Sequence, residues 1–315
     1  MSATAAGGDT AVDCRSNSSA LQAAIAAAAP GAKLTVQGTC TGPFTIGKAL
    51  TLIGRKQAVL DGNHTGTTVT ISAAVQVRLT RLTITGGQGG QGGGIRNSGG
   101  TLTVTHSTVT GNSSTGPGGG GIYNESGTVT VEDSTLAKNT STGTGGGIRN
   151  QGTLTVKSTS VHHNTAQTLG GGIDNVSPST MMVSRSKVHH NTVNTVNGGG
   201  IFNDGTATVD YSEVSDNTSP VGSGGGIRVT GANGRLTLNH TLVRHNTTAA
   251  TGGGVSVGAN AVATLNDSKV RNNTASNGGG VNVDPGGTAT LNRTRVTDNT
   301  PNNCAPTGAV PGCIG

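Results

Sequence analysis

Side chains suited to binding an acidic ligand, or to exchanging a proton with it, recur after a repeated glycine motif. Eight times in the 315-residue chain, three glycines precede an isoleucine or a valine, and the next residue is often charged or aromatic. These eight residues are Arg96, Tyr123, Arg149, Asp174, Phe202, Arg228, Ser256 and Asn282. A guanidinium binds a carboxylate through two parallel hydrogen bonds, and a carboxylate accepts a proton. The glycines leave a floor that a ligand can approach, with Glu125 and Asp204 expected beside it.

Imidazoles gather at a second repeated position. Five of the eight histidines occupy the two positions before a repeated asparagine, namely His162, His163, His189, His190 and His245. If successive repeats stack, these rings lie within about 5 Å of one another and can act as acids, bases or transition-metal ligands. The alternative is a set of polar residues on a loop shoulder, because neighbouring repeats carry Lys138, Asp216 and Asn272 there. No complete ligand set results, so no metal site is predicted.

The spacing of the repeats defines the elements that must position these side chains. The glycine motifs recur every 25 to 28 residues, and between them lie a segment such as Thr101 to Val104 and a Val-x-x-Asn or Leu-x-x-Asn segment. Each repeat thus contains three short strands of alternating polarity. One such unit cannot bury a face alone, but units stacked about 4.8 Å apart can. The sequence therefore predicts an all-β fold, a parallel β-helix of three sheets and about ten coils.

The same register assigns inward and outward positions. We expect Ile122, Val129, Val131 and Leu136 to point inward and to stack on their equivalents in neighbouring coils. The repeated asparagines should lie at bends with left-handed backbone, each amide bonding to the same amide one coil away. They are Asn112, Asn139, Asn164, Asn191, Asn217, Asn246, Asn273 and Asn299.

Both ends of the solenoid need covering, because an open end exposes a sheet edge. Residues 1–33 form the predicted N-terminal segment, with an amphipathic helix from Ser18 to Ala29 that Pro30 and Gly31 stop. Residues 34–300 form the β-helix and residues 301–315 a C-terminal cap. Cysteines occur only near the two ends, so the natural pairing is one local bridge at each end, Cys14 with Cys40 and Cys304 with Cys313.

The Gly-Gly-Gly-Ile and Val-x-x-Asn repeats over residues 92–300 resemble those of the pectate-lyase-like, right-handed parallel β-helix superfamily. They are also similar to the Gly-Gly-Ala-Ile and Phe-x-x-Asn repeats of polymorphic outer-membrane proteins. The resemblance implies a single-stranded, right-handed coil. It does not fix activity, because adhesins, lyases, hydrolases and epimerases share this coil.

In that superfamily the cleft runs along the outer face of the first sheet, walled by the loops before it. Its lyases remove a proton next to a uronate carboxylate, often with calcium assisting. The resemblance therefore implies Arg149 as base or anchor, Asp174 as calcium ligand, and an acidic polysaccharide or small acidic ligand. The candidate catalytic residues are Tyr123, Arg149, Asp174, His163 and His190, and the candidate binding residues are Arg96, Glu125, Phe202, Asp204, Arg228, His162, His189 and His245. The Asp and His motifs of the hydrolase branch and the calcium-binding nonapeptide are absent from the sequence.

Composition and charge indicate which classes of partner and which compartment to expect. The net charge of +6 is spread thinly and the chain has two Tyr, two Phe and no Trp, so nucleic-acid binding is not expected. No apolar run approaches the roughly 18 residues of a membrane span. Disulfides imply an oxidising compartment. We therefore expect an extracellular monomer whose signal peptide has been removed.

Four alternatives stay open. The charged column can be a solvated face of cross-coil pairs. The protein can be a non-catalytic surface or adhesive module, or, with free thiols, a cytosolic tailoring enzyme for a small acidic metabolite. A minor alternative is ice binding by outward Thr-x-Thr pairs such as Thr101 and Thr103, although Met182, Arg235 and Val262 interrupt the array.

Overall fold

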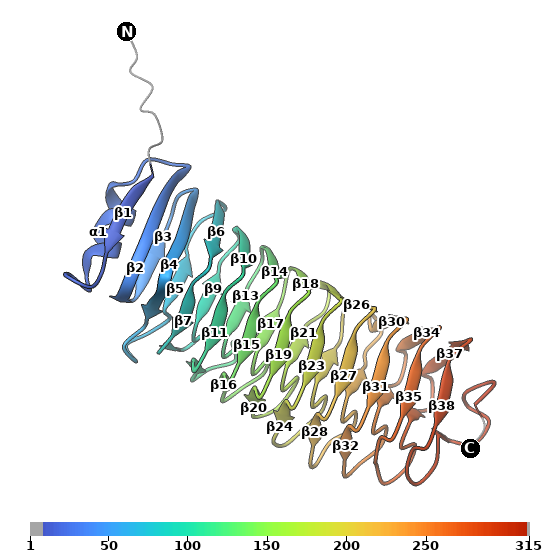
Figure 1. Cartoon of the computed structure of the whole chain (residues 1–315). Coiled ribbons are helices and arrows are strands. Elements are labelled where there is room, and N and C mark those ends of the chain that lie inside the picture. Colours follow the sequence, from blue (N-terminus) through green and yellow to red (C-terminus); the bar gives the residue numbers. More distant parts are fainter. Residues whose placement is uncertain (1–8, 314–315) are drawn as a thin grey trace.

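Parallel strands stack along a rod in which each coil of the chain lies on the one before it (Figure 1). The computed structural model describes residues 9–313. Its strands form three sheets, which we call sheet A with 21 strands, sheet B with 11 and sheet C with 7. From β5 to β32, each coil runs from sheet B through a long and then a short strand of sheet A, and on to sheet C. The predicted β-helix of three sheets is confirmed, and eleven strands in sheet B compare with the roughly ten coils expected.

Sheet A begins with β1 (Thr10–Asp13), β2 (Ala32–Thr41) and β4 (Leu50–Asp61). Its long strands are β6 (Gln76–Thr80), β10 (Thr101–Thr105), β14 (Thr128–Glu132), β18 (Thr153–Lys157), β22 (Thr180–Ser184), β26 (Thr206–Asp210), β30 (Arg235–Asn239), β34 (Val262–Asn266) and β37 (Thr288–Asn292). Its short strands are β7 (Thr83–Thr85), β11 (Thr108–Thr110), β15 (Thr135–Ala137), β19 (Ser160–His162), β23 (Lys187–His189), β27 (Glu213–Ser215), β31 (Leu242–Arg244), β35 (Lys269–Arg271) and β38 (Arg295–Thr297).

The other two sheets have shorter strands. Sheet B consists of β3 (Phe44–Ile46), β5 (Val69–Ile71), β9 (Ile95–Asn97), β13 (Ile122–Asn124), β17 (Ile148–Asn150), β21 (Ile173–Asn175), β25 (Ile201–Asn203), β29 (Ile227–Val229), β33 (Val255–Val257), β36 (Val281–Val283) and β39 (Cys304–Ala305). Sheet C consists of β8 (Gln88–Gly89), β12 (Ser113–Ser114), β16 (Thr140–Ser141), β20 (Thr165–Ala166), β24 (Thr192–Val193), β28 (Thr218–Ser219) and β32 (Thr247–Thr248).

The core is a set of aliphatic columns along the rod. Ile122, Val129, Val131 and Leu136 are each 0% exposed, as predicted, and one column of sheet B continues Ile95 through Ile122 to Ile148 in register. Stacking equivalent residues fills the interior with small and medium side chains, so this chain needs few aromatic rings.

Two ladders of asparagine amides reinforce the stack. From Asn112 to Asn299, each side-chain amide donates to the amide oxygen one coil on, over 2.9 to 3.0 Å, which confirms the predicted ladder. A second ladder, which the sequence analysis missed, runs from Asn97 to Asn203 at the ends of sheet B strands, over 2.7 to 2.9 Å. Buried amides that are fully bonded in this way fix the register of the coils.

The left-handed backbone lies one residue before the position that we predicted. The residue preceding each ladder asparagine has a positive φ, for example 53° at His163 and at His190, whereas the asparagines do not. The expectation for the asparagines is therefore wrong. The preceding residue makes the bend, and this directs the asparagine side chain inward to its partner.

Both ends of the β-helix are covered, largely as the sequence predicts. Helix α1 (Ala20–Ala27) is shorter than the predicted Ser18 to Ala29, and it packs Leu21 and Ile25 into the core beside β1 and β2 (Figure 1). Cys14 is bonded to Cys40 and Cys304 to Cys313, which confirms both local bridges. Residues 1–8 of the predicted N-terminal segment and residues 314–315 of the predicted cap lie outside the described residues. Within residues 9–313, no helix is both long and apolar enough to span a bilayer.

Candidate functional site

The eight residues after the glycine motif form one column on sheet B, which we call the seam. Backbone pairing places Arg96 beside Tyr123, Tyr123 beside Arg149, and Arg149 beside Asp174. The same register continues through Phe202, Arg228, Ser256 and Asn282. Side chains scattered along the sequence thus become neighbours on one side of the rod, as the repeat predicts.

Most of the seam is covered by the glycine turns that precede it. Tyr123 is 4% exposed, Asp174 1% and Phe202 8%, and Ser256 and Asn282 are also buried. The first glycine of a triplet folds back over its own strand. At Gly198, where φ is +74°, an added Cβ would lie only 2.9 Å from the Cβ of Phe202. The glycines that we expected to leave a floor for a ligand therefore also allow a close backbone approach that shields the column.

The outer arginines of the seam are already paired across coils. Arg96 donates to Glu125 over 2.8 Å and Arg228 donates to Asp284 over 2.8 Å. The hydrogen bond from Arg96 holds the pKa of Glu125 below its usual range. Arg228 also donates to Ser256 over 2.6 Å. These ion pairs agree with the alternative in which the charged column is a face whose side chains pair across coils.

The centre of the seam is different, because its ion pair is longer than those of Arg96 and Arg228. The Nε of Arg149 lies 3.6 Å from Oδ2 of Asp174, an ion-pair distance that is too long for a hydrogen bond. The Nε of Arg149 is buried without a hydrogen-bond partner among the described residues, as is the Nε of Arg228. Burial raises the pKa of Asp174 to about 6. A side-chain hydrogen bond with Thr144 and the charge of Arg149 oppose the effect of burial on the pKa of Asp174.

Tyr123 and Asp204 complete this central group. The guanidinium carbon of Arg149 lies 5.9 Å from the centre of the Tyr123 ring, and the Tyr123 hydroxyl is 2.5 Å from Oε1 of Gln151. Burial raises the pKa of the Tyr123 phenol, so this group stays protonated and is a potential proton donor. Burial also raises the pKa of Asp204, whose negative charge adds to the rise at Asp174.

Four of the five predicted histidines come together in sheet A. The rings of His162 and His189 stack with centroids 5.0 Å apart, and those of His163 and His190 stack at 5.1 Å. The Nδ1 atoms of His162 and His163 are 2.8 Å apart, and those of His189 and His190 are 2.9 Å apart. One nitrogen of each pair must carry the hydrogen and the other must accept it. The predicted spacing of about 5 Å is confirmed.

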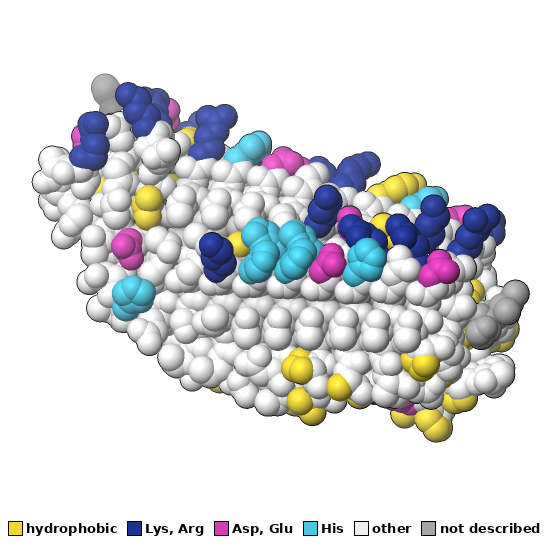
Figure 2. All heavy atoms as spheres, turned by 60° about the horizontal axis from the view of Figure 1, so that its bottom comes forward, with side chains coloured by type: hydrophobic (Ala, Val, Ile, Leu, Met, Phe, Trp, Pro, Cys, Tyr) yellow, Lys and Arg dark blue, Asp and Glu magenta, His cyan; other side chains and the backbone are white. Residues whose placement is uncertain are grey.

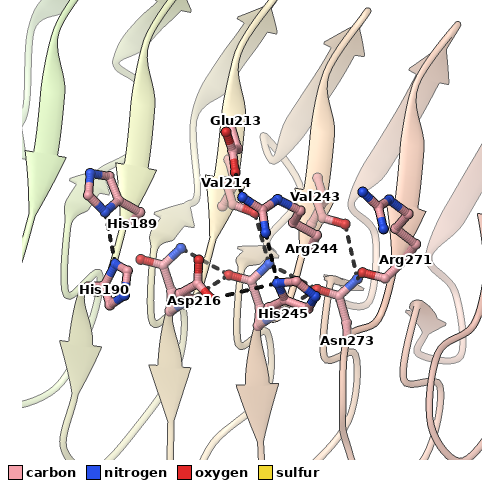
Figure 3. Close-up of polar contacts among 12 residues, drawn as sticks. His189, His190, Glu213, Val214, Asp216, Val243, Arg244, His245, Arg271 and Asn273 are labelled. Atoms are coloured by element: carbon pink, nitrogen blue, oxygen red, sulfur yellow. Dashed lines mark hydrogen bonds and ion pairs between the residues drawn. The ribbon is translucent and has the colours of Figure 1, made fainter.

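His245 lies two coils further along and belongs to a separate network (Figure 3). Its Nδ1 is 2.8 Å from Nη1 of Arg244 and 3.8 Å from Oδ1 of Asp216. Arg244 also contacts Oε1 of Glu213 over 2.6 Å. Sheet C and the glycine turns follow the histidines in each coil and precede the seam, so the two candidate regions lie on different sheets.

Comparison with known proteins assigns the fold family. A family profile described as the right-handed β-helix region matches residues 120–304, more than half of the chain. The chain belongs to this right-handed β-helix family. A search of curated proteins finds no match.

A comparison with solved structures finds two polysaccharide lyases. One is the pectate lyase Pel9A, with a TM-score of 0.45 and 16% identity over 91% of this chain and 74% of the other. The second is an alginate lyase from Paenibacillus sp. strain FPU-7, with a TM-score of 0.39 and 12% identity over 96% of this chain and 97% of the other. At such low identity these likenesses carry no information about activity.

The calcium that the resemblance implies does not fit the donor set at Asp174. Calcium takes six to eight oxygen ligands. At Asp174 the closest charged group is the guanidinium of Arg149, which would repel a cation. Within the described part of the chain, no group of three or more His, Cys, Asp or Glu side chains is arranged to hold a metal ion. Calcium therefore has no part in the chemistry that we assign to these residues.

The outward threonines of this β-helix also stack in register. Thr101, Thr128 and Thr153 form one column and Thr103, Thr130 and Thr155 a second. The expected interruptions are present on the same face, and Met182 is 46% exposed there. Protruding side chains of this kind break the flat array on which the ice-binding alternative depends.

The sequence analysis missed one further column, which lies at the turn between the long and short strands of sheet A. Its residues have left-handed backbone and include Arg185, Tyr211, His240, Asp267 and Arg293. The rings of Tyr211 and His240 stack in parallel, with centroids 4.6 Å apart. A serine or threonine follows each of these residues, and that repeated Ser or Thr is the signal that would have located the column.

Proposed function

We propose that this β-helix protein is extracellular and cleaves an acidic polysaccharide by elimination beside a uronate, at Tyr123, Arg149 and Asp174. The observation that carries the proposal is the buried carboxylate of Asp174, 3.6 Å from the Nε of Arg149, which has no hydrogen-bond partner among the described residues. Each buried polar group without a hydrogen bond costs about 1 to 3 kcal/mol. A substrate carboxylate that pairs with Arg149 would remove part of that cost and would free Asp174 to act as a base.

The proposed reaction assigns one role to each of the three side chains. Arg149 pairs with the uronate carboxylate and stabilises the negative charge that develops there. Asp174, ionised above its pKa of about 6, takes the proton from the neighbouring carbon. The electron pair of that C–H bond forms a carbon–carbon double bond as the glycosidic C–O bond breaks. Tyr123 gives its proton to the departing oxygen and is afterwards reprotonated from solvent.

Access to this site requires the covering glycine turn to move. Asp174 is 1% exposed, and Gly145 and Gly170, which have positive φ values of 62° and 58°, lie against the strands of Arg149 and Asp174. Glycine turns can change conformation at low steric cost. We propose that substrate binds after this turn has opened.

The two disulfides support the extracellular part of the proposal. None of the four cysteines is free, and disulfides persist in oxidising compartments. The alternative of a cytosolic enzyme requires free thiols, and none of the four cysteines has one.

The test is an elimination assay with uronic-acid polysaccharides, in which the ultraviolet absorbance of unsaturated products is followed. We expect product from the wild type, a loss of at least about 100-fold in Asp174→Asn, and a similar loss in Arg149→Lys, which keeps the charge but not the planar fork. Lys157→Ala is the control, because Lys157 pairs with Glu132 on a long strand of sheet A. Equal product from Asp174→Asn and the wild type would refute the proposal.

A non-catalytic binding module is the second candidate, and the burial of the seam favours it. It predicts retention of an acidic polysaccharide without any unsaturated product. It also predicts that Asp174→Asn and Arg149→Lys bind as the wild type does. The same two variants therefore separate the two candidates.

A further inference from the structure

A band of charged side chains runs along the short strands of sheet A (Figure 2). We call it the basic strip. It comprises the outward residues of β19, β23, β27, β31, β35 and β38 and the left-handed residues on either side of these strands. Its cations are Arg185, Lys187, Arg244, Lys269, Arg271, Arg293 and Arg295, and its acids are Glu213, Asp216, Asp267 and Asp298. The strip lies on a different sheet from the seam.

Most cations of the basic strip have no acidic partner. Arg244 pairs with Glu213, and Arg293 pairs with Asp267. The other five cations, Arg185, Lys187, Lys269, Arg271 and Arg295, form no ion pair within residues 9–313. All of these except the half-buried Arg271 are exposed. The strip therefore presents unneutralised positive charge to solvent, unlike the paired ends of the seam.

Like charges also face each other across coils in this strip. Backbone register places Arg244 beside Arg271 and Lys269 beside Arg295. Like charges that lie directly opposite on neighbouring strands destabilise a sheet. A hollow of about 360 Å³ opens at this point and is lined by His240, Thr241, Leu242, Asp267, Lys269 and Arg271. An anion lying there would relieve the repulsion that the fold otherwise retains.

An aromatic platform adjoins the same hollow. Tyr211 is 62% exposed and its ring is parallel to that of His240, which lines the hollow. An exposed flat ring can pack against the apolar face of a sugar. Binding of single-stranded nucleic acid uses one ring for each successive base, and Tyr211 is the one aromatic residue of Phe, Tyr or Trp type that is exposed among the described residues. The surface therefore fits an acidic sugar polymer better than a nucleic acid.

We propose that the basic strip is a second binding surface of this protein, on which a linear acidic polysaccharide lies parallel to the rod. Its carboxylate or sulfate groups sit over Lys269, Arg271 and Arg295, one sugar packs on Tyr211, and the chain continues toward the stacked histidines. Neighbouring coils are about 4.8 Å apart, so anionic groups one coil apart meet a cation on the coils of β31, β35 and β38, whereas the coil of β27 offers the Tyr211 ring instead. The inference shares the ligand class of the proposed function but none of its residues.

Two of the stacked imidazoles, those of His162 and His189, make this binding depend on pH. Burial and the neighbouring imidazoles lower the pKa of His162, and they lower that of His189 to about 4. Lys138 and Lys187 add to this effect, and Asp216 lies one coil beyond His190. A bound anion favours the charged imidazoles, so proton binding and anion binding support each other. The polysaccharide should therefore bind more tightly at pH 5.5 than at pH 7.5.

The test compares two variants that remove the same charge from the full chain. Lys269→Ala/Arg271→Ala changes the strip, and Arg55→Ala/Lys56→Ala changes exposed residues of β4 near the other end of the rod. Dextran sulfate and polygalacturonate are the probes, neutral dextran and single-stranded DNA are the comparisons, and binding is measured by calorimetry at both pH values. We expect about tenfold weaker binding for the strip variant and less than about twofold for the control. Thermal unfolding checks that both variants fold.

Two further variants sharpen the result. Tyr211→Ala should weaken binding of both polysaccharides but leave binding of inorganic polyphosphate unchanged. His162→Ala/His189→Ala should remove most of the difference between pH 5.5 and pH 7.5.

Three outcomes would overturn the proposal. They are equal losses in the strip and control variants, binding of single-stranded DNA as tight as that of dextran sulfate, and no binding of either acidic polysaccharide. Unsaturated products formed by a protein whose strip variant binds normally would overturn this inference and leave the proposed function standing.

Discussion

The seam and the basic strip are built from the same coils but treat charge in opposite ways. In the seam, Arg96 and Arg228 are ion-paired and Asp174 is buried under a glycine turn. In the strip, Lys269 and Arg295 are exposed, in register and without acidic partners among the described residues. The difference comes from the turns. Glycines before sheet B fold over the strand, whereas the left-handed residues around the short strands of sheet A carry side chains and leave the strand open.

The two regions share the asparagine ladder, so breaking it should damage both. Asn191 donates to Asn217 and to the backbone oxygen of Val161, and it accepts a hydrogen bond from Asn164. Asn191→Ala leaves these buried groups without partners and should lower the free energy of unfolding by about 3 to 5 kcal/mol. Chemical denaturation measures this loss. A change below about 1 kcal/mol would show that the ladder does not hold the coils in register.

The two kinds of turn should lose different amounts of stability on substitution. Gly170 has a φ of +58°, and an added Cβ would lie 2.4 Å from the carbonyl oxygen of Ile173. Gly170→Ala should therefore cost about 2 kcal/mol or more, since both strain and a clash arise. His190 also has a positive φ, so His190→Gly should cost much less, because glycine adopts this backbone freely. Equal losses in thermal unfolding would contradict the contrast between covered and open turns.

The seam should lose stability as pH rises. Asp174 has a pKa of about 6 in the folded chain against 3.8 as the ordinary value. The folded state therefore binds more protons than the unfolded state between these values, and stability falls as pH increases through 6. The wild type should lose about 2 kcal/mol between pH 4 and pH 7 that Asp174→Asn does not lose. If the stability of the two proteins depends on pH in the same way, the pKa of Asp174 is not raised and its carboxylate is solvated.

The basic strip should lose stability as pH falls, which is the reverse of the pH dependence expected for the seam. The folded pKa of His189 is lowered to about 4, below the ordinary 6.5, so the unfolded state binds more protons between these values. Because the ring is partly exposed, solvent screening should limit the effect to under about 1 kcal/mol. His189→Gln should flatten the stability curve between pH 6.5 and pH 4. If His189→Gln loses as much stability as the wild type between pH 6.5 and pH 4, other groups cause that loss.

The sequence predicted the coils, the inward residues and the order of both columns, because all of these depend only on the repeat. Ile122 and Val129 point inward and Tyr123, Arg149 and Asp174 are neighbours, as the period requires. The repeat does not determine how a glycine turn lies. The triple glycine predicts an open floor, but the absence of side chains also lets the turn close over Asp174.

Other features depend on backbone detail that the period does not contain. The left-handed residue falls at His163 rather than at Asn164, because a bend can be made one residue earlier without changing the spacing. The Tyr211 and His240 stack arises from two adjacent coils that carry rings at the same turn, and this turn had not been identified. The pKa of Asp174 depends on its burial, which follows from the turn and not from the repeat.

The most direct test of the account is the pH profile of polysaccharide elimination. If Asp174 is the base, the rate at which the wild type forms unsaturated product should rise as pH increases through about 6 and then level off. Asp174→Asn should form almost no product at any pH from 5 to 8, although thermal unfolding should show that it is folded throughout this range. Absence of product from the wild type, or the same profile in Asp174→Asn, would contradict the account.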